Sequence, residues 1–360
     1  MKKEQIIQGP CTIKVLEGEA RIIGIDIRKN DSLTIPSNKT YTIVYDNNTK
    51  LEMNCKKLLN NVNLGWDQIV QEIVDTGGVV VLLGNTDSGK TYLANLFTNL
   101  ATSYLKIIDA DVGQSTLFLP TFIAELKPMR KTLNLEELGY DSLEFFGDIT
   151  PSTNPRLHVQ KIVRLYETTP KEKLTVIDTD GWTNGLNSML HKFELLYTID
   201  PDYIIVFDQK IKDYLPENYR NRAILLKSIN LRKSRSERRA NRITKYERYF
   251  NEANNVKIPS ENVLGKPISD ILYYAWGEYI QLSDEEPCVG HYISLNLLKG
   301  ALLGIIENKK VVGAALLVNL KENEITILSR VNKFTGLVLG YISLNDKFQE
   351  RRIRFRKCKS

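Results

Sequence analysis

The sequence has few cysteines and no pattern of them that indicates a metal site. Four cysteines lie far apart along 360 residues, and none belongs to a C-x-x-C pair: Cys11, Cys55, Cys288 and Cys358. We therefore expect neither a zinc site nor a disulfide framework, and a reducing cytoplasm as the setting. The three histidines also lack the spacing of metal ligands.

The chain also lacks the signals of export, membrane insertion and disorder. No run of about 18 apolar residues occurs, and the charged N-terminal segment has no apolar core like that of a signal peptide. A composition of 42% hydrophobic and 26% charged residues is close to the globular average, and the net charge of +6 is modest. These values predict a soluble, intracellular protein of two or three domains with no membrane partner.

Both ends of the chain have the composition of β-structure. Near the N-terminus, four segments rich in Ile, Val, Thr and Tyr are separated by turn compositions: Cys11–Leu16, Ala20–Ile27, Ser32–Ile35 and Tyr41–Tyr45. Near the C-terminus, three further segments are joined by charged turns typical of hairpins: Ala301–Ile306, Val311–Leu320 and Glu324–Leu328. We therefore predict small all-β domains over residues 1–60 and 253–360.

The middle of the chain, residues 61–252, has the pattern of an α/β domain. Four short apolar runs alternate with helical patterns: Val79–Leu83, Tyr104–Ile108, Leu174–Ile177 and Tyr203–Phe207. Such runs are typical of strands buried on both faces of a parallel sheet. A helical pattern over residues 57–75 precedes them. The fold class is therefore predicted to be α/β, with a mainly parallel central sheet between the two β domains.

The first of these apolar runs leads into a phosphate-binding motif. Residues 84–91 match G-x-x-x-x-G-K-[ST] and are followed by a helical pattern, as in a P-loop NTPase. In such a loop, backbone N–H groups surround the β-phosphate, Lys90 reaches the β- and γ-phosphates, and Thr91 binds Mg²⁺. The alternative is a glycine-rich turn with an incidental lysine. We assign nucleotide binding to the loop and the residue after it: Gly84, Asn85, Thr86, Asp87, Ser88, Gly89, Lys90, Thr91 and Tyr92.

Aspartates follow the other predicted strands, at the edge where α/β sheets bind ligands. Asp109 and Asp111 follow one apolar run, and Asp178 and Asp208 follow the next two. One carboxylate is expected to hold Mg²⁺, and another to take a proton from an attacking hydroxyl group. Each of them is equally explained as a turn residue or a helix cap. No N-K-x-D tetrad for guanine occurs, which favours ATP.

Basic residues are concentrated between positions 232 and 248. Four arginines share one face of the helix predicted there: Arg235, Arg238, Arg239 and Arg242. Like charges at this spacing repel, so the face is expected to meet a phosphoryl group or a nucleic-acid backbone, unless it is simply solvated. A second basic run over residues 347–359 is either another such contact or a solubilising tail.

Trp182 either stacks on a base or packs beneath a loop.

Several motifs, taken in order, resemble those of one family. They are G-x-x-D-S-G-K-T at 84–91, D-x-D-x-G-Q at 109–114, T-P-x-x-N-P at 150–155, D-T-x-G-W at 178–182 and F-D-Q at 207–209. Together with the arginine-rich segment, they resemble the polynucleotide 5′-hydroxyl kinases related to the mRNA 3′-end cleavage-factor kinase and the nucleolar rRNA-processing kinase. The chain looks like a compact, archaeal-type member. The resemblance covers nearly the whole chain, because residues 15–24 and 300–339 resemble that family's two small β domains.

On the nucleotide side, the resemblance implies that Lys90 and Thr91 hold ATP and Mg²⁺, with Asp109 and Asp111 near the metal. It also implies that Asp111 is the general base for the 5′-hydroxyl group. The family usually has asparagine where Asp178 stands. A carboxylate there is a further candidate metal ligand, so the base stays open between Asp111, Asp109 and Asp178.

On the acceptor side, the resemblance implies that Gln114 orders the metal or the nucleophile and that Thr150 belongs to a clasp on the substrate end. Trp182 would stack on the terminal base. These three residues are therefore the predicted substrate-binding residues.

The resemblance also implies a lid whose arginines close over the triphosphate. Two lid arginines normally stand five residues apart, but here Lys233 lies five residues before Arg238. Lysine offers no bidentate fork to phosphate, so Arg235 or Arg232 is expected to act in its place if the lysine does not. We assign the lid role to Arg238 and Arg235.

The favoured hypothesis is an ATP- and Mg²⁺-dependent kinase of 5′-hydroxyl ends of RNA, with single-stranded DNA as a second substrate class. One rival is a catalytically idle, ATP-bound scaffold of an RNA-processing complex. Another is an ATPase switch that never contacts nucleic acid. The intact P-loop, Asp111 and Trp182 argue against the scaffold, and the basic helix argues against the switch. The preference between RNA and DNA, the protein partners and the oligomeric state stay open.

Overall fold

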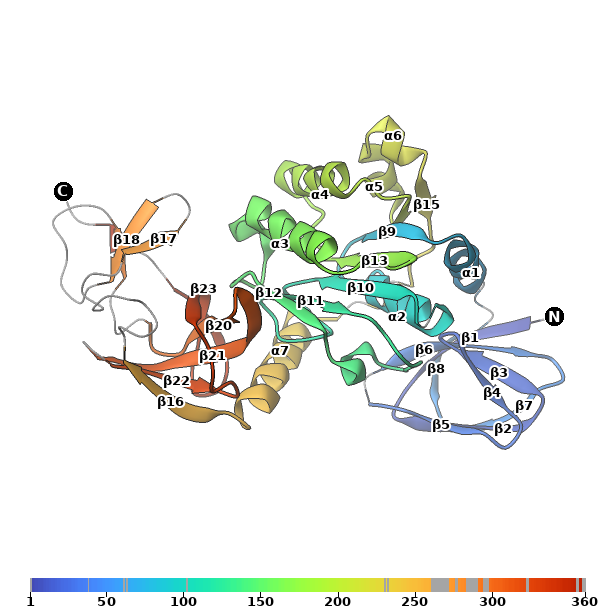
Figure 1. The fold of residues 1–360 in the computed structure, drawn as a ribbon. Coiled ribbons are helices and arrows are strands. Elements are labelled where there is room, and N and C mark those ends of the chain that lie inside the picture. Colours follow the sequence, from blue (N-terminus) through green and yellow to red (C-terminus); the bar gives the residue numbers. More distant parts are fainter. Residues whose placement is uncertain are drawn as a thin grey trace.

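A computed structural model describes most of the chain (Figure 1). The described residues are 2–259 apart from 38, 61, 63, 102, 230 and 232, then 298–357 apart from 322, 323, 354 and 355. Between them, only the strands 272–275, 278–282 and 291–293 are described. Cys288, Cys358 and Arg232 therefore lie outside the described residues, as do Arg354 and residues 358–360 of the C-terminal basic run.

The N-terminal residues form two small β-sheets, drawn in blue in Figure 1. One sheet has the order β4-β3-β6-β1-β8: β1 (Lys2–Gln8), β3 (Glu19–Ile22), β4 (Ile25–Arg28), β6 (Thr40–Asp46) and β8 (Lys56–Asn60). The other has the order β5-β2-β7: β2 (Cys11–Glu17), β5 (Ser32–Ile35) and β7 (Lys50–Met53). Along β2, alternate residues such as Ile13 and Val15 are buried, as expected for a strand with one face on a core.

Two predictions for this region were wrong in detail. The segment Ala20–Ile27 is not one strand, because a turn at Ile23 and Gly24, both with positive φ, folds it into the hairpin β3–β4. Residues 57–60 are not helical, because they belong to β8, which pairs with β1. The helix α1 begins only at Trp66. Pairing with a distant strand therefore decided the conformation of β8, and the local helical period did not.

The expectation of no disulfide was also wrong. Cys11 and Cys55 form a disulfide across a sequence separation of 44 residues. Pairing of β2 with β7 places Ile13 opposite Met53, and the two cysteines lie just beyond this pair. A spacing along the chain carries no information about distance across a sheet. The inference of a reducing compartment, which rested on unpaired cysteines, loses its basis at this pair.

Among the described residues, no helix is long and apolar enough to cross a membrane.

The central sheet confirms the predicted α/β fold. Its order is β15-β14-β9-β13-β10-β11-β12, and β15 to β10 run parallel while β11 and β12 are antiparallel. The strands are as follows: β9 (Gly78–Leu83), β10 (Leu105–Ala110), β11 (Phe122–Leu126), β12 (Ser142–Phe145), β13 (Leu174–Thr179), β14 (Tyr203–Val206) and β15 (Ala223–Leu225). All four predicted apolar runs are strands of this sheet.

Helices cover both faces of the central sheet (Figure 1). The helices α1 and α2 share one core with one face of β9 and β13, and α3 and α4 share a second core with the other face. The helices have these bounds: α1 (Trp66–Thr76), α2 (Lys90–Leu100), α3 (Pro155–Thr168), α4 (Leu186–Ile199), α5 (Gln209–Tyr214), α6 (Glu217–Arg220) and α7 (Arg235–Phe250). Two short 3₁₀ turns, Leu135–Leu138 and Pro151–Thr153, lie in the loops.

The C-terminal strands continue the central sheet, because β12 pairs with β21 at Leu143 and Val311. The strands of this part are as follows: β16 (Asn254–Pro259), β20 (Ala301–Glu307), β21 (Lys310–Lys321), β22 (Glu324–Ser329), β23 (Gly336–Leu344) and β24 (Glu350–Arg352). The predicted hairpin between β20 and β21 turns at Asn308 and Lys309, both with positive φ.

A further sheet in this region has the order β17-β18-β19-β25: β17 (Leu272–Ala275), β18 (Glu278–Leu282), β19 (His291–Ile293) and β25 (Arg356–Lys357). Helix α7 runs between the central and C-terminal sheets in Figure 1. Its residues Tyr246 and Phe250 belong to the same core as Leu302, Ile342 and Leu344. The C-terminal strands are therefore packed directly against the helix that carries the predicted lid.

Candidate functional site

The phosphate-binding loop connects β9 to the first residue of α2. Gly89 is the N-cap of α2 with φ 110°, and a Cβ there would come within 2.7 Å of the Trp66 ring. Glycine is therefore required at this position both by conformation and by space. No side chain among the described residues caps the helix, so its first N–H groups are left for an anion, as in other phosphate sites.

Lys90 is buried within the loop. Its Nζ donates hydrogen bonds to the carbonyl oxygens of Gly84 and Asn85, at 2.9 Å each. Burial lowers the pKa of Lys90, while the nearby carboxylates of Asp178 and Asp111 raise it. The loop therefore holds an ammonium group on its own carbonyls, beside the position where a P-loop binds phosphate.

Asp178 contacts the last residue of the phosphate-loop motif, Thr91. It lies on β13 next to Asp109 of β10, and its Oδ2 accepts a 2.7 Å hydrogen bond from the Thr91 hydroxyl group. Its Oδ1 is buried and accepts no hydrogen bond from the described residues. Burial, reinforced by Asp109, raises the pKa of Asp178 to about 7. A buried oxygen without a donor, beside a threonine hydroxyl, fits a hard divalent cation.

Asp111 faces the adjoining cavity. Its Oδ1 accepts hydrogen bonds from the backbone N–H groups of Gly113 and Gln114, at 3.0 and 2.9 Å, which fixes the carboxylate. Burial raises its pKa to about 6, and the negative charge of Asp180 adds to this shift. A carboxylate that is fixed and has a raised pKa is suited to accept a proton near neutral pH.

The other two strand-end aspartates support loops. Oδ2 of Asp109 accepts hydrogen bonds from the Ser115 hydroxyl group and from the N–H groups of residues 116 and 117. Asp208 caps α5 and accepts a hydrogen bond from Nδ2 of Asn85 in the phosphate loop. Asp208 is therefore a helix cap, as the alternative interpretation of the sequence had it. Asp109 is 3% exposed and does not line the cavity.

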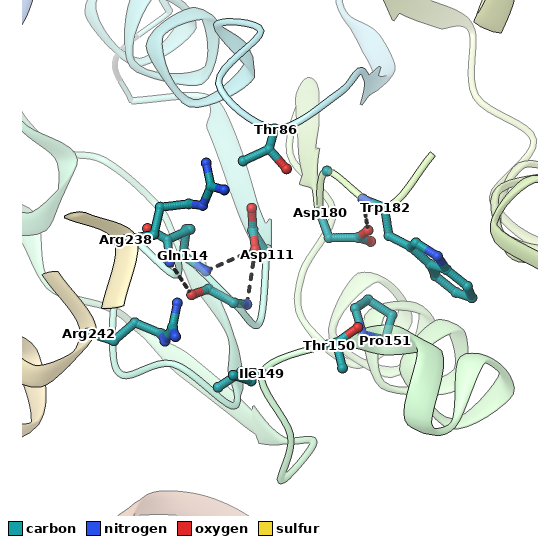
Figure 2. A pocket seen from close by; sticks show the side chains of 12 residues that line it. Thr86, Asp111, Gln114, Ile149, Thr150, Pro151, Asp180, Trp182, Arg238 and Arg242 are labelled. Atoms are coloured by element: carbon teal, nitrogen blue, oxygen red, sulfur yellow. Dashed lines mark hydrogen bonds between the residues drawn. The ribbon is translucent and has the colours of Figure 1, made fainter. Parts of the chain in front are cut away.

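A cavity of about 230 Å³ lies between the phosphate loop, the strand-end loops and α7 (Figure 2). Figure 2 shows Trp182 on one side of Asp111, and the arginines of α7 on the other. The cavity brings together residues from five separate segments of the chain: Thr86, Asp111, Gly113, Gln114, Ile149, Thr150, Pro151, Asp180, Gly181, Trp182, Arg238 and Arg242. The sequence predictions Asp111, Gln114, Thr150, Trp182 and Arg238 are thus close in space.

Trp182 is held at the rim of this cavity. Its backbone N–H donates a 2.7 Å hydrogen bond to Oδ1 of Asp180, and its ring lies 5.6 Å from that of His191. The side chain is half-buried. It therefore combines a fixed backbone with partial access to solvent, as stacking on a base requires.

The turn before Trp182 approaches the phosphate loop closely. A Cβ on Gly181 would lie 2.3 Å from Oγ1 and 2.6 Å from the backbone N of Thr86. We expect Gly181→Ala to lower the free energy of unfolding by about 1–3 kcal/mol, because overpacking forces the loop apart. The control is Gly336→Ala, in which the nearest neighbour of the new Cβ lies 3.7 Å away. This variant should unfold at the same urea concentration as the wild type or at a slightly higher one. Equal unfolding free energies for the two variants, by urea titration, would contradict the prediction.

Behind Trp182 lies a buried cluster that the sequence did not predict: His158, Asp180, His191 and Lys192. His158 Nε2 lies 3.0 Å from the carbonyl oxygen of Ala110, so this nitrogen carries the proton and Nδ1 accepts from His191 Nε2, also at 3.0 Å. Burial lowers the pKa of His158 to about 4 and that of His191 to about 2, which keeps both rings neutral.

This cluster has the composition of a metal site, because ligand atoms of His158, Asp180 and His191 lie within 4.8 Å of one another. However, Nζ of Lys192 forms a 2.5 Å ion pair with Oδ2 of Asp180. Lys192 lowers the pKa of Asp180 to about 2 against the effect of burial. The ammonium group thus provides the cation in this cluster, and the four residues form a rigid support for Trp182.

The lid segment, which we define as residues 233–242, is docked on the phosphate loop. NH1 of Arg238 donates to Oδ2 of Asp87 at 3.0 Å and to the carbonyl oxygen of Lys233 at 2.7 Å. The backbone N–H of Lys233 donates to the same Asp87 oxygen. The helix begins with a capping box formed by Ser234 and Glu237. Lys233 therefore takes part through its backbone in the present arrangement.

Two predicted positions differ from the geometry. Arg235 is exposed and does not line the cavity, whereas Arg242 does. Arg242 was one of the four arginines on the predicted face, but the spacing alone did not single it out. Tyr92 contacts the rings of Tyr41 and Trp66, so its side chain faces the N-terminal sheets.

Gln114 and Thr150 lie at the cavity with their polar groups partly engaged. The Gln114 side chain donates to the carbonyl oxygen of Gly113, and the Thr150 hydroxyl group lies 2.9 Å from that of Ser152. Both contacts are local, between neighbours in sequence. They leave the two side chains on the wall of the cavity, where a substrate would meet them.

The comparisons with known proteins agree with this geometry. The family model for the P-loop of the mRNA cleavage and polyadenylation factor CLP1 matches residues 84–252. The polyribonucleotide 5′-hydroxyl-kinase of Pyrococcus furiosus is 33% identical over 193 residues, which cover 51% of this chain and 54% of that protein. That of Pyrococcus abyssi is 26% identical over 300 residues, which cover 72% of this chain and 84% of that protein. The chain thus spans about half the length of the first relative.

A chain in a solved structure of Clp1p with Pcf11p has the same fold. It superposes with a TM-score of 0.65 over 95% of this chain and 96% of its own length, at 15% identity. The shared fold extends beyond the central sheet to both flanking parts of the chain. The match to the CLP1 P-loop family model, residues 84–252, lies within this shared fold.

Proposed function

We propose that this protein transfers the γ-phosphate of ATP to the 5′-hydroxyl end of RNA, with single-stranded DNA as a second substrate class. The main observation in support is that Asp111 lines one cavity between the phosphate loop and Trp182. A phosphate cradle, a proton acceptor and an aromatic platform are the parts that such a transfer requires. The names of the archaeal relatives support the same activity.

On the nucleotide side, the loop residues 84–91 would hold the triphosphate of ATP. Lys90 would leave the carbonyl oxygens of Gly84 and Asn85 and place its charge on the β- and γ-phosphates. Thr91 and Asp178 fit a Mg²⁺ ion, because Oδ1 of Asp178 is buried without a donor, and Asp111 lies close by. This ion would neutralise charge on the phosphates. The proposal places Asp178 ahead of Asp109, whose Oδ2 is bound to loop 115–117.

On the acceptor side, the 5′-hydroxyl oxygen attacks the γ-phosphorus while the bond from that phosphorus to ADP breaks. The hydroxyl proton goes to Asp111, whose raised pKa suits this role. Gln114 and Thr150 would orient the substrate end. Arg238, together with Arg242 in place of the exposed Arg235, would stabilise the charge of the transferring group.

Trp182 is proposed to bind the terminal base by stacking. A base on an aromatic ring contributes about 1–3 kcal/mol and does not depend on the base. Trp182→Ala should therefore raise the KM for the oligonucleotide by roughly 5- to 150-fold and leave the KM for ATP almost unchanged. Trp182→Phe should recover much of the loss, because a ring remains. Steady-state kinetics with oligonucleotides of different 5′ bases measure this.

The control for Trp182 is a melting curve on the same variants. A tryptophan that acts only in packing predicts a large fall in melting temperature for Trp182→Ala. An unchanged oligonucleotide KM together with such a fall would contradict the stacking role.

The function is tested by incubation with γ-labelled ATP and 5′-hydroxyl oligonucleotides of RNA and DNA. We expect label on RNA, a requirement for Mg²⁺ and loss of transfer when the ion is chelated. Bound ATP without transfer would favour an idle scaffold, and label released only as inorganic phosphate would favour an ATPase switch.

We further propose an intracellular setting, because ATP and newly cleaved RNA ends occur together there.

A further inference from the structure

We propose that β24, the three-residue strand 350–352 near the C-terminus, positions both walls of the substrate cavity. One wall is Arg242 of α7, and the other is the clasp, which we define as residues 148–153. The proposal rests on the proposed function, because it assigns specificity for the nucleic-acid end to residues outside the kinase core. Glu350 and Arg352 are then positioning residues, since they do not line the cavity themselves.

The first contact is between β24 and the lid helix. Glu350 accepts two hydrogen bonds from Arg242, one from Nε at 2.6 Å and one from NH2 at 2.8 Å. The side chains of this pair are only 15% and 9% exposed, so solvent screens it little. The bidentate contact fixes the plane of the guanidinium group of Arg242, which lines the cavity.

The second contact is between β24 and the clasp. Arg352 donates from NH1 and NH2 to the two carboxylate oxygens of Asp148, at 2.8 and 3.2 Å. The same carboxylate accepts hydrogen bonds from the Thr153 hydroxyl group and the Ile149 backbone N–H, both at 2.6 Å. The Asp148 side chain is fully buried. It therefore ties both ends of the clasp, which presents Thr150 to the cavity, to the C-terminal strand.

The geometry of a strand explains why β24 can make both contacts. Residues two apart lie on the same face, so Glu350 and Arg352 point the same way and Arg351 points to the other face. The strand is itself fixed by pairing with β23, where Leu344 is opposite Glu350. The backbone N–H of Tyr341 on β23 also donates to the carbonyl oxygen of Gly147, directly before the clasp. The lid helix, the clasp and the C-terminal sheet thus form one unit.

This arrangement also explains part of the second basic run. Its Arg352, whose side chain is 53% exposed, pairs with the buried carboxylate of Asp148, whereas Arg351, which is also exposed, lies on the other face of β24. A solubilising tail requires no such pair. The distance between Arg242 and the clasp, which sets the room for the substrate end, is therefore determined by a strand more than 100 residues away along the chain.

The experiment compares Arg352→Gln with the matched control Arg351→Gln, which changes the same charge on the opposite face of β24. The first readout is equilibrium binding of a fluorescent 5′-hydroxyl RNA oligonucleotide, and the second is transfer of label from ATP. We expect Arg352→Gln to weaken binding at least tenfold and to lower kcat/KM by up to about 10²-fold, because a displacement of about 1 Å has this effect. The KM for ATP should not change. Arg351→Gln should match the wild type apart from a small, salt-dependent loss.

The double variant Arg352→Gln/Asp148→Asn separates positioning from stability. It removes the buried negative charge that the single variant leaves without its positively charged partner, so its melting temperature should return toward that of the wild type. Its oligonucleotide binding should stay weak, because the neutral pair no longer holds the clasp. A double variant that binds RNA as tightly as Arg351→Gln would overturn the proposal. If the wild type binds RNA but transfers no label, while the double variant still binds weakly, the proposed kinase activity fails and the positioning role stands.

Discussion

Asp111→Asn is expected to lower kcat for phosphate transfer by about 10²–10⁴-fold, the usual contribution of a positioned general base. The KM for ATP should change little, because the amide retains the size of the carboxylate and the P-loop is untouched. Oδ1 of Asp111 is held by two backbone N–H groups, so the variant side chain can keep the same position with its carbonyl oxygen. Steady-state kinetics with saturating ATP and varied oligonucleotide measure the effect.

The matched comparison for this prediction is Asp178→Asn. Asp178 accepts from the Thr91 hydroxyl group, so its substitution should mainly raise the Mg²⁺ concentration needed for half-maximal activity. The roles are exchanged if Asp111→Asn keeps near-normal turnover while Asp178→Asn abolishes it at every Mg²⁺ concentration.

Lys90→Ala is expected to leave the fold intact and to lower the transfer rate by about 10²–10³-fold. The variant lacks the positive charge on the β- and γ-phosphates in the transition state, and loss of one positioned electrostatic group has an effect of this size. Among the described residues, the ammonium group donates hydrogen bonds to carbonyl oxygens of the phosphate loop, so the helices and strands around it do not depend on it. Single-turnover transfer and circular dichroism on the same sample measure both parts of the prediction.

The control for Lys90→Ala is Lys106→Met. Lys106 is also buried, but it lies on β10 and donates to the carbonyl oxygen of Tyr166 and the hydroxyl group of Thr169, in a contact with the end of α3. We expect this variant to unfold more easily and to transfer phosphate normally. A Lys90→Ala protein that phosphorylates ends at the wild-type rate would contradict the assignment of the P-loop.

Much of the fold could be predicted because its signals are local. The apolar runs at Val79–Leu83 and Leu174–Ile177 are strands, and the motif between β9 and α2 is a phosphate loop. Errors occurred where distant pairing outweighs local pattern. The strand β8 exists because β1 lies beside it, and the disulfide exists because β2 pairs with β7.

The residues of the site also fall into those that the sequence could predict and those that it could not. Asp111 and Trp182 could be found because strand ends of a parallel sheet meet at one edge, and both line the cavity. Glu350 could not be found, because its partner Arg242 is 108 residues away. Asp148 and Arg352 are 204 residues apart, and neither lies in a motif. The two histidines behind Trp182 come from α3 and α4, so no spacing along the chain relates them.

The proposed kinase activity is tested most directly by asking whether transfer requires a free 5′-hydroxyl group on the RNA. One RNA oligonucleotide is prepared with a 5′-hydroxyl group and, in parallel, with a 5′-phosphate, and each is incubated with γ-labelled ATP, Mg²⁺ and the wild-type protein. The proposed kinase activity predicts label on the 5′-hydroxyl RNA alone, removable by a phosphatase that acts on terminal phosphates. Equal labelling of both RNAs, or release of inorganic phosphate with no labelled RNA, would contradict it.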